Sequence, residues 1–144
     1  MNNASDSDSP IKLENSIGFL LRQALQRHTS NFSEHIGHDL TRAQTAVLAW
    51  LYAEGPCSQN LLGRHTGIDA STIKGVVDRL HDRALLTIEP DAADKRRRVI
   101  DLSVEGRRLF DEVLPVGRQI GELTLAPLTA TERETLFTLL RKIT

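Results

Sequence analysis

Two short apolar-patterned segments joined by a glycine constrain the fold of this chain more than any other feature. A first helix is expected over residues 59–65, with Ser58 as its N-cap. Gly67 follows as a turn residue that tolerates a positive φ angle. A second helix then begins at Asp69 or Ser71 and ends near residue 83. Two short helices with a tight glycine-containing turn between them predict a helix-turn-helix.

A β-hairpin is expected directly after this motif. The apolar runs Leu85–Ile88 and Val99–Leu102 are short and β-prone, and a turn-rich, charged loop over residues 91–98 separates them. A hairpin that follows a helix-turn-helix defines a winged helix. The fold class expected is therefore mainly α with a small β-hairpin wing.

Longer helices are expected on both sides of this unit. Apolar residues recur every three or four positions from Leu13 to about His35, and again after Ser103 to about Leu125, where Pro115 predicts a kink. Capping boxes predict two more helices that begin after Thr41 and Thr129. The domain organisation expected is a disordered tail at 1–10, a winged-helix lobe at 41–103 and a helical region at 11–36 and 104–144.

Composition excludes several broad classes of protein. The 144 residues, 40% hydrophobic and 26% charged, fit a single globular domain. No apolar run reaches the ~18 residues of a membrane span, and the N-terminus lacks the apolar stretch of a signal peptide. A net charge of −1 argues against a protein that coats nucleic acid indiscriminately. We expect a cytoplasmic protein with no membrane partner.

The second helix of the motif has two chemically distinct faces. Its apolar face is expected to be buried and consists of Ile73, Val76, Val77 and Leu80. The opposite face and its flank are slim and polar, with Asp78 and Asp82 beside the candidate DNA contacts Ser71, Thr72, Lys74, Gly75 and Arg79. Hydroxyls and a lysine can bind base edges or phosphates, and a small residue allows close approach in a major groove about 12 Å wide. The alternative is an ordinary solvated helix face.

The loop of the hairpin carries four consecutive cations, Lys95, Arg96, Arg97 and Arg98. Like charges repel, so folding alone gives little reason to gather them at a loop tip. Phosphate binding does, because each neutralised phosphate releases counterions. An arginine at the tip can also enter a narrow minor groove. Asp94 is expected to pair with Arg96 and orient it; a merely solvated charge run is the alternative.

Residues 68–106, IDASTIKGVVDRLHDRALLTIEPDAADKRRRVIDLSVEG, resemble the MarR (multiple antibiotic resistance regulator) family of bacterial transcription factors. LTRAQ at 40–44 and LTATERETLFTLLRKI at 128–143 are also similar to family segments. The resemblance implies a homodimer built by the terminal helices, a palindromic double-stranded DNA operator and release by a small ligand. Asp94 and Arg96 match the wing motif of the family, whereas Ala84 replaces a usual glycine and Ile88-Glu89 a commonly basic pair.

The segment QNLLGRHTGIDASTIKGVVDRL is similar to the subgroup that represses nicotinate degradation and responds to 6-hydroxynicotinate. The resemblance thus implies a small aromatic acid as effector and no cofactor. Such a ligand needs a stacking surface and a cation. In this architecture the pocket walls come from the first two long helices and the helix after the wing, which carry Arg22, His28, His35, His38, Trp50, Tyr52 and Arg118.

Several alternatives compete with these interpretations. A tryptophan such as Trp50 is more often a core-packing residue, and each histidine is more often a satisfied surface group. His28, His35 and His38 have no cysteine or carboxylate cluster at zinc-ligand spacing, so no metal is expected. Cys57 is interpreted as a buried, inert thiol rather than a redox switch. No glycine-rich phosphate loop or nucleophile elbow indicates an enzyme. A winged helix that contacts protein instead of DNA is the alternative function.

Overall fold

The computed structural model describes residues 12–144, so the tail predicted at 1–10 lies outside the described residues. The elements in chain order are a 3-10 turn η1 (Leu13–Asn15), α1 (Ile17–His35), α2 (Arg42–Glu54), α3 (Gln59–Thr66), α4 (Ala70–Asp82), β1 (Leu86–Pro90), β2 (Arg98–Leu102), α5 (Val104–Thr124) and α6 (Ala130–Ile143). The fold is mainly helical with one antiparallel hairpin, as predicted. Within the described part of the chain, no helix has the length and apolar character needed to cross a membrane.

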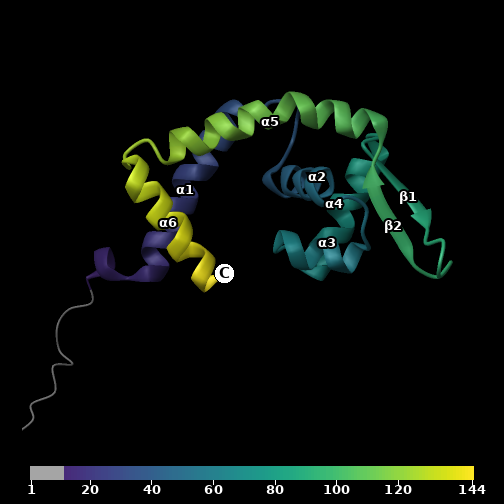
Figure 1. Cartoon of the computed structure of the whole chain (residues 1–144), viewed down its shortest axis with the longest axis horizontal. Coiled ribbons are helices and arrows are strands. Elements are labelled where there is room, and N and C mark those ends of the chain that lie inside the picture. Colours follow the sequence, from purple (N-terminus) through teal and green to yellow (C-terminus); the bar gives the residue numbers. More distant parts are fainter. Residues whose placement is uncertain (1–11) are drawn as a thin grey trace, which may run out of the picture.

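The elements form two groups that α5 connects (Figure 1). Helices α2, α3 and α4 and the hairpin form a winged-helix lobe at one end. Helices α1 and α6 lie at the other end, beside the C-terminal half of α5. Helix α5 continues through Pro115 and arches over the molecule, so its two halves belong to different groups.

Side-chain caps set most of the helix starts. Thr41 and Thr129 form the expected capping boxes with Gln44 and Glu132, respectively. Of the two starts considered for the second helix of the motif, Asp69 is the N-cap of α4 and accepts a hydrogen bond from the Thr72 amide. Cap positions were readable from sequence because a short polar side chain satisfies amides that the helix leaves free.

Two local features differ from the sequence-based expectation. The first long helix does not begin at Leu13, because Ser16 has extended backbone angles (φ −83°, ψ 119°) that separate the 3-10 turn from α1. The absence of the usual glycine after α4 does not remove the left-handed residue there. Ala84 itself adopts φ 58°, and its amide donates to the His81 carbonyl oxygen over 2.8 Å.

The main core lies in the winged-helix lobe and extends along α5. Its most completely buried large side chains are Leu48, Leu51, Leu62, Ile73, Leu80, Ile100, Ile120, Val47, Val77 and Val113. Cys57 belongs to this core and is bridged to Ile100 by backbone hydrogen bonds. Burial raises the pKa of the Cys57 thiol, which supports the interpretation of an inert cysteine.

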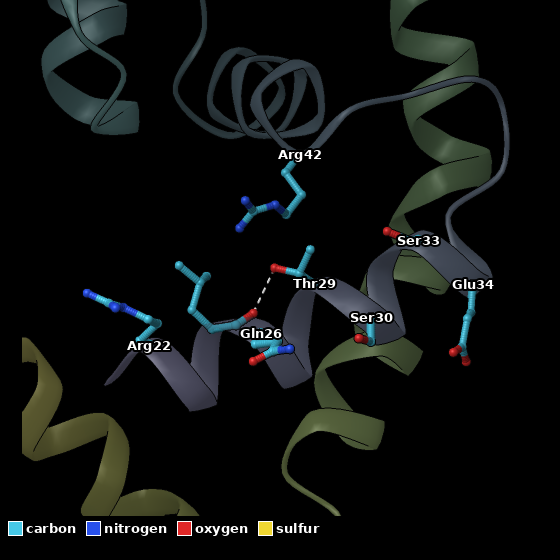
Figure 2. Close-up of a pocket in the computed structure, with 8 residues that line it drawn as sticks. Arg22, Gln26, Thr29, Ser30, Ser33, Glu34 and Arg42 are labelled. Carbon is cyan, nitrogen blue, oxygen red and sulfur yellow. Dashed lines mark hydrogen bonds between the residues drawn. The ribbon is translucent and has the colours of Figure 1, made fainter. Parts of the chain in front are cut away.

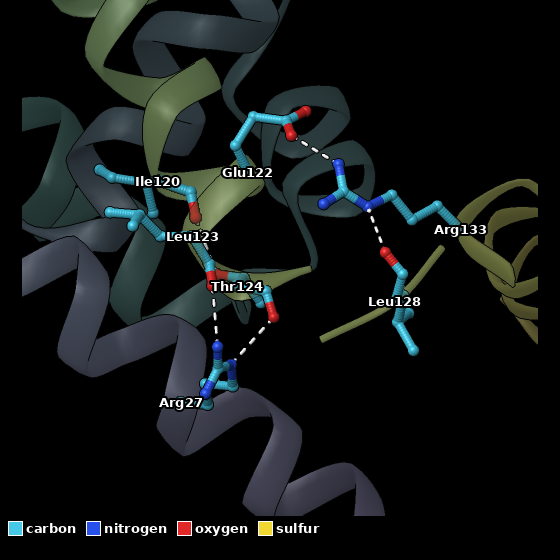
Figure 3. Close-up of polar contacts among 7 residues, drawn as sticks. All are labelled: Arg27, Ile120, Glu122, Leu123, Thr124, Leu128 and Arg133. Atoms are coloured by element: carbon cyan, nitrogen blue, oxygen red, sulfur yellow. Dashed lines mark hydrogen bonds and ion pairs between the residues drawn. The ribbon is translucent and has the colours of Figure 1, made fainter. Parts of the chain in front are cut away.

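Polar contacts hold the helices of the other group together (Figure 3). Arg27 of α1 donates to the carbonyl oxygens of Thr124 and Leu123, both over 2.9 Å, and thereby caps the C-terminus of α5. Arg133 of α6 pairs with Glu122 of α5 and donates to the Leu128 carbonyl oxygen. These contacts fix α1 and α6 relative to α5.

Apolar side chains of η1, α1 and α6 remain exposed despite these contacts. No residue of α6 is buried, and Phe32 is the buried residue of α1. The exposed set is Leu13 (58%), Ile17 (66%), Leu20 (44%), Leu21 (44%), Leu25 (52%), Phe137 (47%), Leu139 (55%) and Ile143 (67%). So many large apolar side chains at one end of a small protein mark an association surface.

The start of α5 is positioned by a close approach to the backbone that precedes the hairpin. A Cβ atom built on Gly106 would lie 2.0 Å from the carbonyl oxygen of Leu85. Ser103 caps α5 by accepting from the Gly106 amide, and its hydroxyl donates to the Ala84 carbonyl oxygen. Gly106 thus lets the first turn of α5 lie directly against residues 84 and 85.

Replacing Gly106 with alanine should destabilise the protein by about 1–3 kcal/mol, because the methyl group overpacks against main-chain atoms. Thermal or denaturant unfolding measures the change. Val104→Ala is the matched control, since Val104 lies in the same helical turn and is 84% exposed. The control should stay within about 0.5 kcal/mol of wild type, and equal stability of all three proteins would contradict the packing argument.

Candidate nucleic-acid interface

Helix α4 has the two faces that its sequence predicts. The apolar face of Ile73, Val76, Val77 and Leu80 is buried in the core. Ser71, Thr72, Lys74 and Arg79 are exposed, and Gly75 is half-buried. The burial of one face therefore fixes which side chains α4 presents outside the lobe.

The hydroxyls of Ser71 and Thr72 are both bound to the N-cap carboxylate. Ser71 donates to Oδ1 of Asp69 over 2.5 Å, and Thr72 donates to Oδ2 over 2.9 Å. These hydrogen bonds, with the one from the Thr72 amide, lower the pKa of Asp69. While the protons are held in this way, each hydroxyl oxygen can only accept from an incoming group. That state suits the amino groups of adenine or cytosine and not a phosphate oxygen.

The cations of α4 lie along the helix rather than away from it. Lys74 Nζ is 2.6 Å from Oδ2 of Asp78, one turn further on. The Arg79 guanidinium passes beside Gly75, where a Cβ would lie 3.2 Å from Nη2. Gly75, proposed from sequence to allow close approach of DNA, thus also makes room for Arg79. Both cations are exposed and would have to extend to contact a ligand.

Hydrogen bonds within the loop between β1 and β2 define the shape of that loop. The Asp91 amide donates to the Arg97 carbonyl oxygen over 2.8 Å, and the Arg97 amide to that of Asp94 over 2.9 Å. Asp94 Oδ1 accepts from the Arg96 amide over 3.0 Å. The hairpin therefore carries a turn of defined shape at its tip.

The expectation of a side-chain pair between Asp94 and Arg96 was wrong, because Asp94 pairs with a different arginine. The carboxylate of Asp94 contacts the backbone of Arg96, and its ion pair is with the Arg97 guanidinium at 3.8 Å. The Asp94 side chain is short enough to accept a hydrogen bond from the backbone amide two residues later. This contact shapes the turn. Lys95, Arg96 and Arg98 have no carboxylate within 4.0 Å among residues 12–144, so their charge is available to a partner.

The strands of the hairpin and helix α4 line one recess. Lys74 and Asp78 contribute from α4 and Arg98 from β2, together with Gln59, Ile88 and Ile100. Sequence reasoning placed Lys74 and Arg98 in separate parts of the candidate surface and missed Gln59. Its position at the first residue of α3, after the Ser58 cap, was the available signal.

The residues predicted to bind an effector are spread over several environments. Trp50 stacks on His65 of α3, with ring centroids 4.9 Å apart. The Tyr52 hydroxyl donates to Asp111 over 2.6 Å, which raises the pKa of Tyr52. His35 contacts the carbonyl oxygen of Asn31 in its own helix. The structure therefore does not bring Trp50, Tyr52 and His35 to one pocket.

The remaining candidates are also divided. His38 Nε2 lies 3.9 Å from Glu112, and Arg118 is exposed on α5. His28 Nδ1 contacts Thr124 Oγ1 at 3.0 Å. Because the Thr124 hydroxyl donates to the Ile120 carbonyl oxygen, His28 is the donor in that contact. The described residues contain no cluster of three or more histidine, cysteine or carboxylate side chains that could hold a metal.

Arg22 alone of the predicted set lines a groove of about 550 Å³ between α1 and the start of α2 (Figure 2). The other lining residues are Leu25, Gln26, Thr29, Ser30, Ser33, Glu34 and Arg42. Arg42 lies in the first turn of α2, and its side chain points toward α1 (Figure 2). Sequence reasoning missed Arg42, although a cation at a helix N-terminus is electrostatically disfavoured and signals another role.

A second groove adjoins the first along the α1–α2 linker. Residues Thr29, Ser33 and Arg42 line both grooves, and the second also includes residues 36–41. The combined surface offers two arginines, several hydroxyls and the apolar side chains of Leu25 and Phe32, beside the carboxylates of Glu34 and Asp39. This composition fits a small anionic ligand with an apolar ring.

Comparisons with known proteins agree with this architecture. Residues 38–97 match the MarR family. The chain is similar to the HTH-type transcriptional repressor NicR of Pseudomonas putida, with 39% identity over 94% of this chain and 87% of that protein. It is also similar to the structure of BpsR from Bordetella bronchiseptica, whose DNA binding is regulated by 6-hydroxynicotinic acid. There the identity is 38%, the TM-score is 0.88, and 94% of this chain and 97% of that one are covered.

A third likeness is to a MarR variant from Escherichia coli complexed with operator DNA. The TM-score is 0.84 at 25% identity, over 94% of this chain and 99% of that one. The family relationship thus extends from sequence over nearly the whole chain to the fold of the complete winged helix and its flanking helices. The chain belongs to the MarR family.

Proposed function

We propose that this protein is a ligand-responsive transcriptional repressor that acts in the cytoplasm. As a homodimer it binds a two-fold symmetric DNA operator through α4 and the wing, and a small aromatic acid releases it. The observation that carries the proposal is the exposed basic wing beside the polar face of α4, on a chain whose net charge is −1. Two relatives support the rest: one is a repressor, and in the other 6-hydroxynicotinic acid regulates DNA binding.

The wing and α4 make different contributions in this proposal. The unpaired cations of the wing bind phosphates or the minor groove, which gives affinity with strong salt dependence. Ser71, Thr72, Lys74 and Gly75 of α4 face the major groove, and Arg79 binds a phosphate. The likeness to a MarR variant complexed with operator DNA supports this partner over a protein surface. DNA is therefore the favoured partner.

The proposed dimer buries the exposed apolar side chains of α1 and α6. A second copy of the chain offers a matching apolar surface, as a two-fold interface requires. Two winged helices in one dimer can contact half-sites about 34–36 Å apart, one turn of DNA.

The groove between α1 and α2 is the proposed effector site. Arg22 and Arg42 can bind the carboxylate of the ligand, and Leu25 can contact its ring. The likeness to BpsR favours 6-hydroxynicotinate as the first compound to test. Binding there would act on the linker between α1 and the winged-helix lobe, since residues of the linker line the adjoining groove.

Arg96→Ala should weaken binding to every duplex sequence and flatten its salt dependence. Each phosphate contact contributes roughly 0.9 to the slope of log K against log salt, so a dimer losing two contacts loses about 1.8. Fluorescence anisotropy with a duplex selected by the wild-type protein from a random library measures this. Arg108→Gln is the control, because Arg108 belongs to α5 and its ion-pair partner is Glu105 of the same helix. An unchanged slope in Arg96→Ala would refute the role given to the wing.

Leu139→Glu should convert the dimer to monomers, because it places a charge among apolar side chains of the proposed interface. Sedimentation equilibrium at micromolar concentration measures the change. Thr138→Glu adds the same charge next to the apolar stripe of α6 and should leave the dimer intact. Dimerisation of both variants would show that α6 lies outside the interface.

Arg42→Gln should weaken binding of 6-hydroxynicotinate by about 10-fold or more, because a charge-assisted hydrogen bond contributes roughly 1.5–3 kcal/mol. Isothermal titration calorimetry measures the affinity, with Arg108→Gln again as the control. Salicylate, nicotinate and 4-hydroxybenzoate define the selectivity. Equal affinities of wild type and Arg42→Gln would place the effector elsewhere.

A further inference from the structure

The linker between α1 and α2 contains three consecutive residues in the left-handed region. Gly37, His38 and Asp39 have φ angles of 61°, 56° and 55° in succession. The Leu40 amide donates to the Gly37 carbonyl oxygen over 3.3 Å and closes the turn. Glycine adopts such angles freely, and histidine and aspartate adopt them more readily than most other residues, although at some cost. Contacts from elsewhere can therefore stabilise this turn.

Arg83 supplies those contacts. Its Nη1 donates to the Asp39 carbonyl oxygen over 3.0 Å and its Nη2 to the His38 carbonyl oxygen over 2.8 Å. One planar guanidinium thus binds the carbonyl groups of both non-glycine residues that have a positive φ angle. The fixed spacing of its donors makes this grip directional, which a lysine ammonium could not reproduce.

Arg83 also ends α4, the proposed recognition helix that faces the major groove. It is the C-cap of α4, and Ala84 after it takes the left-handed conformation. The Ala84 carbonyl oxygen accepts from the Ser103 hydroxyl over 2.6 Å, and the Ser103 amide donates to the Leu85 carbonyl oxygen over 3.1 Å. A displacement of Arg83 is therefore transmitted to the end of α4 and to the start of α5.

The same linker also lines the groove that adjoins the proposed effector site. Gly37, His38 and Asp39 line the groove that adjoins the one containing Arg22 and Arg42. His38 is additionally 3.9 Å from Glu112 of α5. The turn at 37–40 therefore both lines the groove and binds the guanidinium of Arg83.

We propose that Arg83 is the positioning residue that couples the effector groove to the recognition helix. The inference rests on the proposed function and assigns its transmission step to one side chain. A ligand in the groove shifts the carbonyl groups of His38 and Asp39. Arg83 follows them and re-orients the C-terminal end of α4, so that α4 no longer fits the major groove. Binding of the effector and binding of DNA then weaken each other through the two hydrogen bonds that Arg83 donates to the linker.

The test compares Arg83→Gln, Arg83→Lys and the control Arg108→Gln with wild type. The affinity for the selected duplex is measured by anisotropy without and with saturating 6-hydroxynicotinate, salicylate, nicotinate or 4-hydroxybenzoate. Couplings between sites are typically about 5–150-fold and reciprocal. We expect wild type and Arg108→Gln to show such a ratio, Arg83→Gln to fall below about threefold, and Arg83→Lys to lie between.

Calorimetry on the same variants separates coupling from simple loss of a site. Arg83→Gln should bind the acid and the duplex separately and lose only their mutual antagonism. If Arg83→Gln keeps the wild-type ratio, the inference is wrong while the proposed function stands. If no acid changes DNA binding by wild type, the ligand response in the proposed function is wrong instead.

Hydrogen exchange provides a readout that needs no effector. Binding of the selected duplex to wild type should change the protection of amides in both 80–85 and 36–41. In Arg83→Gln the change should be confined to 80–85, and Arg108→Gln should behave as wild type. Equal changes at 36–41 in wild type and Arg83→Gln would overturn the inference, as would no change at 36–41 in wild type.

Discussion

The burial of one face of α4 is the constraint on which the rest of the molecule depends. Ile73, Val76, Val77 and Leu80 pack into the core formed with α2, α3, the hairpin and α5. Because a helix turns by about 100° per residue, burial of these four determines which side chains face outward. Packing of the buried face therefore orients the side chains of α4 that are candidates for base contacts, and these side chains keep their orientation without a ligand.

Charge in this protein is organised locally rather than globally. The net charge is −1, yet the wing tip exposes four consecutive cations, and α4 holds Lys74 against Asp78. The carboxylates of Asp91 and Asp94 accept hydrogen bonds from the Ala93 and Arg96 amides and so shape that tip. Acidic residues thus contribute to a basic surface without neutralising most of it. This distribution favours binding at a specific place over general attraction to nucleic acid.

Sequence predicted the local structure well because local rules govern it. Caps at Thr41, Ser58, Asp69, Ser103 and Thr129 each satisfy amides of their own helix, and Gly67 has the positive φ that its turn needs. The long-range contacts were not predictable in the same way. Stacking of Trp50 on His65, capping of α5 by Arg27 and the grip of Arg83 on the linker join residues from different elements. The effector groove belongs to this second class, which is why Arg42 was missed.

The central claim is that a small aromatic acid controls DNA binding by this chain. The most direct measurement is an anisotropy titration of the wild-type protein against its selected duplex, with and without saturating 6-hydroxynicotinate, at several salt concentrations. The account predicts salt-dependent binding that the acid weakens at least about fivefold. Binding with no salt dependence, or binding that neither this acid nor its aromatic analogues alter, would contradict it.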